Sequence, residues 1–117
     1  MHKLDNLCLI VDNNGLQIDG PVEEVAGLEP LDQKFEAFGF SVIKICGHCF
    51  TQIEEAFTKA RQTKDKPTVI IAQTVKGKGV SFMENQVGWH GTAPNEEQYK
   101  TAMKELENTL KELEGKQ

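Results

Sequence analysis

Three short runs of hydrophobic residues dominate the pattern along the chain. Residues 6–11 and 68–72 are continuously apolar, without the polar alternation of a half-buried strand. Such runs are typical of strands that are covered on both faces. The third run, residues 40–45, contains the β-branched residues Val42, Ile43 and Ile45, which favour a strand. The pattern therefore predicts three strands, two of them buried on both faces.

Apolar residues between the predicted strands recur at helical spacing. Leu28, Leu31, Phe35 and Phe38 recur in this way, and a first helix is expected over residues 30–38, because Pro30 suits the first helical position and Gly39 suits the position just past the end. Thr51 and Glu54 have the spacing of a capping box, in which each side chain satisfies a backbone amide at the helix start. A second helix is therefore expected to begin at Thr51.

A third helix is expected near the carboxyl end of the chain. Asn95 and Gln98 have the spacing that caps a helix start. The apolar face of this helix consists of Tyr99, Ala102, Met103, Leu106, Leu110 and Leu113. That face could pack on the sheet or against another chain.

The order of the predicted elements indicates the fold class. Strands alternate with helices, which is typical of an α/β fold with a three-layer parallel sheet and right-handed crossovers. Three strands are few for such a sheet, so at least one edge and part of a face should be uncovered. Residues 74–92 contain four glycines and no clean period, so they are interpreted as a long functional loop. Residues 1–117 contain no repeat or linker and are interpreted as one partial domain.

Composition and charge exclude several classes of protein. The 117 residues carry 13 Lys and Arg against 18 Asp and Glu, and the net charge of −5 disfavours a nucleic-acid partner. No apolar run approaches the roughly 20 residues of a membrane span, and no signal peptide is recognised at the amino terminus. Three cysteines are an odd number, which favours free thiols and a cytoplasmic location.

Two polar loops follow predicted strands, where parallel sheets bind ligands. Residues 12–20 offer amide and carbonyl oxygens that suit Mg²⁺ or Ca²⁺, although the same residues could form an Asx-turn without a ligand. Residues 76–91 combine glycines with Lys76 and His90, which could approach a phosphate and relay a proton. The loop lacks the spacing of a Walker sequence, and His90 could equally be an ordinary surface histidine.

The sequence Cys46-Gly47-His48-Cys49 lies between a predicted strand and a predicted helix. A thioredoxin-type dithiol has this spacing, with its first thiol at a helix amino terminus. The preceding tryptophan and the later cis-proline hairpin of such proteins are missing, so we predict that Cys46 and Cys49 do not run a redox cycle. A zinc site at Cys46, His48 and Cys49 lacks a second pair of ligands.

Several segments of the chain, in the right order, resemble transketolase. The matching segments are residues 3–7, 10–20, 35–40, 67–72, 74–84 and the sequence Gly88-Trp89-His90-Gly91. The chain is similar to the second half of the thiamine-diphosphate-binding domain, in the style of the amino-terminal subunit of split bacterial transketolases. The context of Trp89 looks more like transketolase than like other thiamine enzymes such as deoxyxylulose-phosphate synthase.

The resemblance implies a site and a reaction. Asn14, through its side chain, and Leu16, through its carbonyl, match two of the family's three protein ligands for Mg²⁺. Lys76 matches the lysine near the thiamine, Ile18 lies where the family lines the thiamine site, and His90 matches the histidine near the diphosphate and the sugar. The implied reaction transfers a two-carbon ketol unit between sugar phosphates, with thiamine diphosphate as cofactor.

The chain departs from the family at its start and at Cys46 and Cys49. The aspartate of the family's Gly-Asp-Gly motif and the glutamate that activates the cofactor have no counterpart here, so the chain is expected to be inactive alone and to need other transketolase segments or subunits. Asp commonly stands where Cys46 and Cys49 stand. The alternative function is a non-catalytic module that self-associates, and a dithiol oxidoreductase is a minor alternative. In addition, a homo-oligomer is expected because the sheet should have open surfaces.

Overall fold

The three predicted strands form one parallel sheet. The computed structural model describes residues 3–18 and 20–115, so Met1, His2, Asp19, Lys116 and Gln117 lie outside the described residues. The sheet contains β1 (Cys8–Asn13), β4 (Ser41–Cys46) and β5 (Thr68–Gln73), and β5 lies in the middle in the order β1-β5-β4. Both pairings are parallel, which confirms the predicted α/β fold class.

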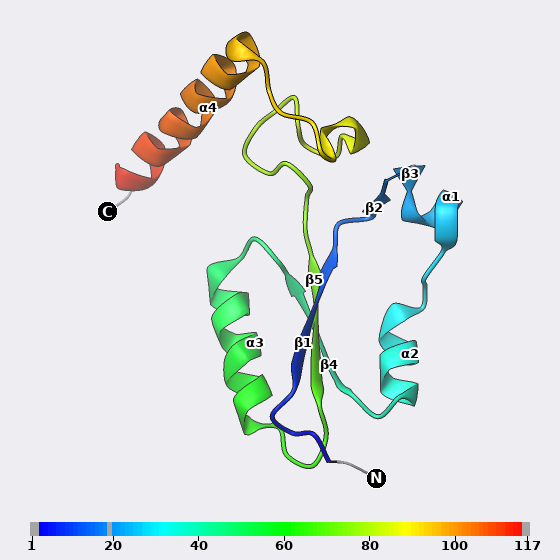
Figure 1. Cartoon of the computed structure of the whole chain (residues 1–117). Helices are drawn as coiled ribbons and strands as arrows, with labels where there is room; N and C mark the ends of the chain where they lie inside the picture. The colour runs from blue at the N-terminus through cyan, green and yellow to red at the C-terminus, as the bar shows by residue number, and fades with distance from the viewer. Residues whose placement is uncertain (1–2, 19, 116–117) are drawn as a thin grey trace.

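The two crossover helices cover opposite faces of the sheet (Figure 1). The chain passes from β1 to β4 through α2 (Leu31–Ala37), then reverses direction along the sheet and reaches β5 through α3 (Phe50–Gln62). Right-handed crossovers in opposite directions place their helices on opposite faces. This arrangement gives the predicted three layers.

The core is centred on β5. The buried residues of that strand are Thr68, Val69, Ile70, Ile71 and Ala72. Ala56 and Ala60 of α3 add to this core. The prediction that residues 6–11 are covered on both faces was wrong, because Leu9 is 38% exposed and Ile10 is 55% exposed. β1 is an edge strand, and in the described part of the chain nothing pairs with its outer side.

Several short elements and helix starts differ from the prediction. A small antiparallel pair, β2 (Leu16–Gln17) with β3 (Gly20–Pro21), and a single-turn helix α1 (Val22–Ala26) follow β1 and were not predicted. The capping box at Thr51 and Glu54 was wrong. The helix α3 begins one residue before Thr51, and among the described residues no side chain caps it.

The two other predicted helix starts are closer to the structure. α4 (Glu96–Glu114) begins with the predicted capping box between Asn95 and Gln98, so that prediction is confirmed. Pro30 is the cap residue of α2 rather than its first helical residue. Gly39 follows the end of α2 with a positive φ of 85°, as expected for a residue that terminates a helix.

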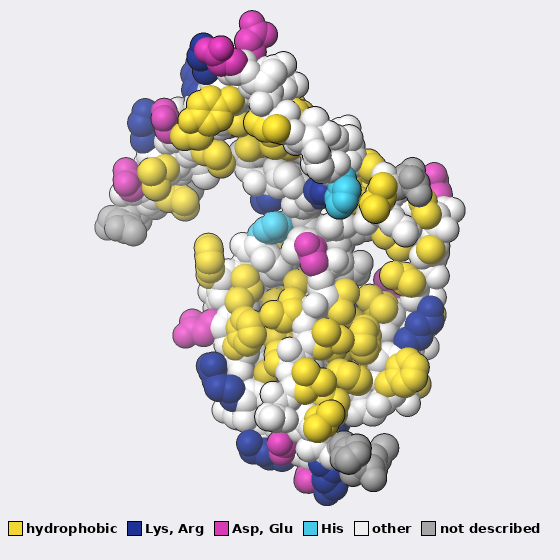
Figure 2. Space-filling view, in the orientation of Figure 1, with side chains coloured by type: hydrophobic (Ala, Val, Ile, Leu, Met, Phe, Trp, Pro, Cys, Tyr) yellow, Lys and Arg dark blue, Asp and Glu magenta, His cyan; other side chains and the backbone are white. Residues whose placement is uncertain are grey.

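The helix α4 extends away from the sheet and leaves the chain open in shape (Figure 1). The radius of gyration is 17.6 Å, whereas a compact domain of this length would have about 13 Å. The large apolar side chains of α4 are exposed, whereas the small side chain of Ala102 is buried. Apolar side chains gather over the sheet and α3, and others follow α4 (Figure 2). Among the helices of the described residues, none has the length and apolar character needed to cross a membrane.

Candidate functional site

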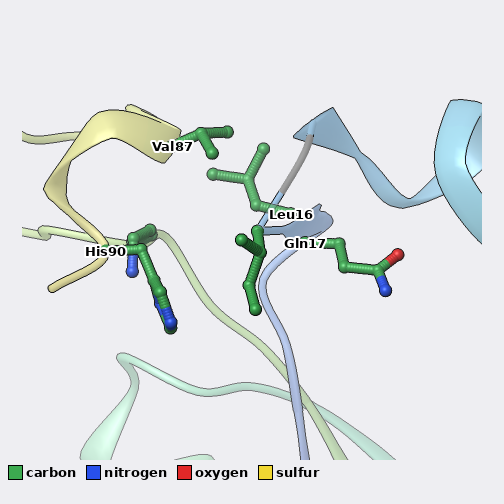
Figure 3. A pocket seen from close by; sticks show the side chains of 6 residues that line it. Leu16, Gln17, Val87 and His90 are labelled. Carbon is green, nitrogen blue, oxygen red and sulfur yellow. The ribbon is translucent and has the colours of Figure 1, made fainter.

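A pocket lies beyond the carboxyl ends of β1 and β5, where ligands bind in parallel sheets. Its volume is about 160 Å³, and its lining residues are Leu16, Gln17, Ile18, Lys76, Val87 and His90. Leu16 and Val87 point toward one another in this pocket, whereas Gln17 points away from His90 (Figure 3). The prediction that the two polar loops meet at this end of the sheet is confirmed.

Four of the residues singled out from the sequence therefore surround one space. Leu16 and Ile18 come from the turn after β1, and Lys76 and His90 come from the loop after β5. Lys76 is half-buried, whereas Ile18 and His90 are exposed. Asn14 does not line this pocket. The pocket brings these groups together, and the individual roles given to them stay predictions.

The turn after β1 is held by an Asx-turn. The Asn14 side-chain Oδ1 accepts a hydrogen bond from the Leu16 backbone amide at 2.9 Å, as the alternative interpretation of this segment expected. Gly15 has a φ of 71°, and its carbonyl accepts a hydrogen bond from Val22 N at 2.9 Å. A second lone pair remains on the Asn14 amide oxygen, so it can still serve as an oxygen ligand.

The described residues do not form a complete metal site of their own. Within residues 3–18 and 20–115, no group of three or more His, Cys, Asp or Glu side chains is placed to hold a metal ion. The nearby Asp12 carboxylate accepts a hydrogen bond from the Thr74 hydroxyl, which ties the end of β1 to the start of the next loop. The Asn14 amide oxygen and backbone carbonyls of the turn fit a minority of the oxygen ligands that Mg²⁺ requires.

The long loop after β5 is folded by its own contacts. Glu84 Oε1 accepts a hydrogen bond from Gly79 N at 3.0 Å and lies 3.4 Å from Lys78 Nζ. The Gly79 amide first, and Lys78 second, lower the pKa of the Glu84 carboxyl below its ordinary value. Ser81 donates from its backbone amide and from its hydroxyl to Glu105 of α4, each at 2.7 Å. The loop is thus held both by its own side chain Glu84 and by Glu105 of α4.

Gly77 is required where the loop passes close to itself. Its φ is 72°, and a Cβ atom on it would lie 2.5 Å from the Met83 carbonyl oxygen. The neighbouring Lys76 carbonyl accepts a hydrogen bond from Asn85 N at 3.0 Å. These contacts fix the backbone on the carboxyl side of Lys76, one of the pocket residues.

Trp89 anchors the later part of the loop after β5, just before His90. The short 3₁₀ helix η1 (Val87–Trp89) precedes His90. Trp89 Nε1 donates a hydrogen bond to the Phe82 carbonyl at 3.0 Å, and the two rings lie 5.4 Å apart. The anchored tryptophan sets the position of Val87 and His90 at the pocket.

The Cys46-Gly47-His48-Cys49 segment is a tight turn with free thiols. Cys46 ends β4, and Cys49 is the cap residue before α3. Cys49 N donates a hydrogen bond to the Cys46 carbonyl at 3.2 Å. The helix start therefore lies at the second cysteine, whereas a thioredoxin-type dithiol places its first thiol there. This geometry supports the prediction that the pair runs no redox cycle.

His48 makes a contact with the loop after β5 that the sequence did not predict. Its Nε2 accepts a hydrogen bond from Val75 N at 2.8 Å. The two residues are 27 positions apart. No local pattern links them, so only the fold brings them together.

Comparison with known proteins decides the family. Residues 1–112 match the family model described as "Transketolase, thiamine diphosphate binding domain". The chain belongs to the transketolase family. Within this family, it is 42% identical over 113 residues to an apulose-4-phosphate transketolase subunit of Phocaeicola vulgatus. It is also 42% identical over 105 residues to a 6-deoxy-6-sulfo-D-fructose transketolase subunit of a Clostridium species.

The chain spans about two fifths of the length of these transketolase relatives. The matches cover 97% and 90% of this chain but only 40% and 38% of the relatives. The solved transketolase of Campylobacter jejuni superposes with a TM-score of 0.80 at 40% identity, over 88% of this chain and 16% of that structure. The fold is therefore the α/β fold of the thiamine-diphosphate-binding domain of the transketolase family.

Proposed function

We propose that this chain contributes one wall of a transketolase active site and works with further transketolase segments or subunits. The reaction would be the transfer of a two-carbon ketol unit between sugar phosphates, with thiamine diphosphate and Mg²⁺ as cofactors. The observation that carries the proposal is the pocket that gathers Leu16, Ile18, Lys76 and His90 from two loops. The family match over residues 1–112 supports the same assignment.

Asn14 and Leu16 are proposed to contribute two oxygen ligands to Mg²⁺. The Asn14 amide oxygen and the Leu16 carbonyl are neutral, hard donors of the kind that Mg²⁺ accepts. Mg²⁺ also needs near-octahedral geometry, and proteins usually bind it through one or two carboxylates together with substrate phosphates. The turn therefore fits part of a magnesium site, and a carboxylate from another segment would complete it.

The size of the pocket supports a shared site. Cofactor pockets usually measure about 300–1,000 Å³, whereas this one measures about 160 Å³. Leu16, Ile18 and Val87 would provide an apolar wall for the cofactor ring, and half-buried Lys76 would place a positive charge beside it. The remaining walls would come from the rest of the assembly.

His90 is proposed to contact the substrate. An imidazole can donate a hydrogen bond to a sugar hydroxyl or to a developing oxyanion, and it can hold a proton near neutral pH. When bound, the thiazolium of the cofactor supplies the electron sink for the reaction. The task of this chain is then to bind, to orient and to stabilise charge.

The three free thiols are consistent with a reducing cytoplasm.

Isothermal calorimetry with Mg²⁺ and thiamine diphosphate tests the proposal. We expect weak or undetectable binding to the chain alone, and micromolar binding once the complementary segments of a split transketolase are added. Asn14→Ala should abolish the restored binding, whereas Asn108→Ala on α4 is a matched control that should retain it. Micromolar affinity of the lone chain would contradict a shared site. No binding in the mixture, together with self-association of the chain, would favour a non-catalytic module.

A further inference from the structure

The turn between β4 and α3 is locked to the exit of β5. Gly47 N donates a hydrogen bond to the Gln73 carbonyl at 2.7 Å. A Cβ atom on Gly47 would overlap the Thr74 methyl group, so a residue without a side chain is needed where this turn lies against the exit of β5. His48, the next residue, is thereby brought over the segment that leads from β5 into the pocket.

His48 extends the hydrogen bonding of the sheet past its last strand residue. β5 ends at Gln73. On one side, Thr74 N still donates to the Asn13 carbonyl of β1, at 3.3 Å. On the other side, Val75 N donates to His48 Nε2 at 2.8 Å. A side chain therefore takes the place that a strand backbone would occupy beside β5.

This bond fixes the residue that immediately precedes Lys76. On the carboxyl side of Lys76, the backbone is fixed by Asn85 N, which donates to the Lys76 carbonyl at 3.0 Å. Lys76 is thus held between two anchors, His48 before it and Asn85 after it. Loss of either anchor would allow the lysine to move relative to Leu16 and His90 across the pocket.

We propose that His48 is a positioning residue, which sets the place of Lys76 in the pocket by accepting the Val75 amide. The contact itself is independent of the reaction, whereas its importance for cofactor binding rests on the proposed function. A nitrogen that accepts a hydrogen bond carries no proton, so the neutral ring of His48 must hold its proton on Nδ1.

The wild-type chain gives the first test. Long-range ¹H–¹⁵N correlation spectra of the full chain distinguish the two neutral tautomers of a histidine. We expect His48 to be the Nδ1–H tautomer. Observation of the Nε2–H tautomer for His48 would overturn the proposal without any variant, because that nitrogen could not accept the Val75 amide.

Two variants of His48 form a matched pair for the second test. His48→Gln places an amide oxygen near the position of Nε2 and should retain the bond, whereas His48→Asn is too short to reach Val75 N. We expect the Val75 amide of His48→Asn to exchange with solvent at least about fivefold faster than in wild type, and that of His48→Gln to be nearly unchanged. Protection of the Ile70 amide should be the same in both variants, which controls for the fold.

Cofactor binding by the chain mixed with the complementary segments of a split transketolase tests whether the His48 contact matters for the pocket. His48→Asn should weaken thiamine diphosphate binding several-fold there, and His48→Gln should restore it. Unchanged Val75 exchange in His48→Asn, or equal losses in both variants, would overturn the positioning role. Faster Val75 exchange with no cofactor binding in any mixture would leave the positioning contact intact and contradict the proposed function instead.

Discussion

β1 and β5 are adjacent strands of similar composition in very different surroundings. Ile10 of β1 lies beside Ile70 of β5 in the sheet, yet Ile10 is 55% exposed and Ile70 is 2% exposed. A groove of about 240 Å³ lies on this face, and Ile10, Phe57 and Ile70 are among its lining residues. The contrast shows that β1 has the composition of a central strand and the position of an edge strand.

The segments that follow the two strands also differ, because the loop after β5 is held by more side chains than the turn after β1. Among its described residues, the turn after β1 is held by the side chain of Asn14 and by the backbone bond from Val22 N to the Gly15 carbonyl. The loop after β5 is held by the carboxylates of Glu84 and Glu105 and by the indole of Trp89. The β5 side of the site is therefore organised within this chain, whereas the β1 side depends more on what packs against it.

The largest loss of folding stability should come from truncation of Ile70, whereas the same truncation of its neighbour Ile10 should cost much less. Ile70→Ala creates a cavity in the core and should lower the free energy of unfolding by about 2–5 kcal/mol. Ile10→Ala removes a half-exposed side chain and should cost only about 1 kcal/mol. Urea denaturation of the two variants measures both values. Equal losses in the isolated chain would show that β1 is already covered, for example by a second copy.

A second pair of substitutions separates backbone strain from steric overlap. Gly15 and Gly77 have φ values of 71° and 72°, but a Cβ on Gly15 meets no described atom within 4 Å. Gly15→Ala should therefore cost about 1–2 kcal/mol from its conformation alone. Gly77→Ala adds the overlap with Met83, which should bring the total to about 2–5 kcal/mol. Thermal unfolding of both variants checks the difference, and equal costs would mean that the loop relaxes around the new methyl group.

The exposed face of β1 should cause self-association. Apolar surface on an edge strand pairs readily with other chains. Analytical ultracentrifugation at micromolar concentration should find species larger than a monomer for the wild type. Ile10→Lys should shift the distribution toward monomer, while Thr58→Lys on an exposed position of α3 should leave it unchanged. A monomeric wild type would contradict the expectation.

The smallest expected effect is a dependence on pH, which should be seen in the loop after β5 but not in the turn after β1. The pKa of the Glu84 carboxyl is lowered from 4.5, mainly by the Gly79 amide. The stabilisation from Glu84 is therefore fully present above about pH 4.5 and is lost as the pH falls through the lowered folded value. The single tryptophan, Trp89, lies in this loop, so its emission should shift to the red on acidification.

Two observations control the pH experiment. Glu84→Gln lacks the titrating carboxylate, so the part of the emission change that depends on Glu84 should disappear. The amide shift of Leu16 should stay constant over the same range, because its partner is the Asn14 amide, which does not titrate. A Glu84→Gln variant with the wild-type profile would assign the change to another group, such as the Glu105 carboxyl that accepts from Ser81.

Local patterns allowed the strands and the meeting of the two loops to be predicted. The apolar runs predicted β1, β4 and β5 because short strands of this composition need no information from distant residues. The Asn95 and Gln98 box predicted the start of α4 for the same reason. The parallel order of the strands then brought both loops to one end of the sheet, which placed Ile18 near His90.

The remaining features depend on contacts that a local pattern does not contain. An apolar run such as residues 6–11 indicates which side chains favour burial, but not whether anything covers them. The capping box at Thr51 failed because the chain enters α3 directly from the tight turn at Cys49. The short β2–β3 pair is closed by the bond from Val22 N to the Gly15 carbonyl, and the His48 contact joins segments 27 residues apart.

The uncovered face of β1 has a consequence for the lifetime of the chain in a cell. Partly uncovered cores open more often, and the population of open forms governs degradation by proteases. A partner that binds the folded chain and covers β1 lowers that population by mass action. If the chain works with further transketolase segments, as proposed, its abundance should follow the abundance of those segments, because uncovered copies would be degraded first.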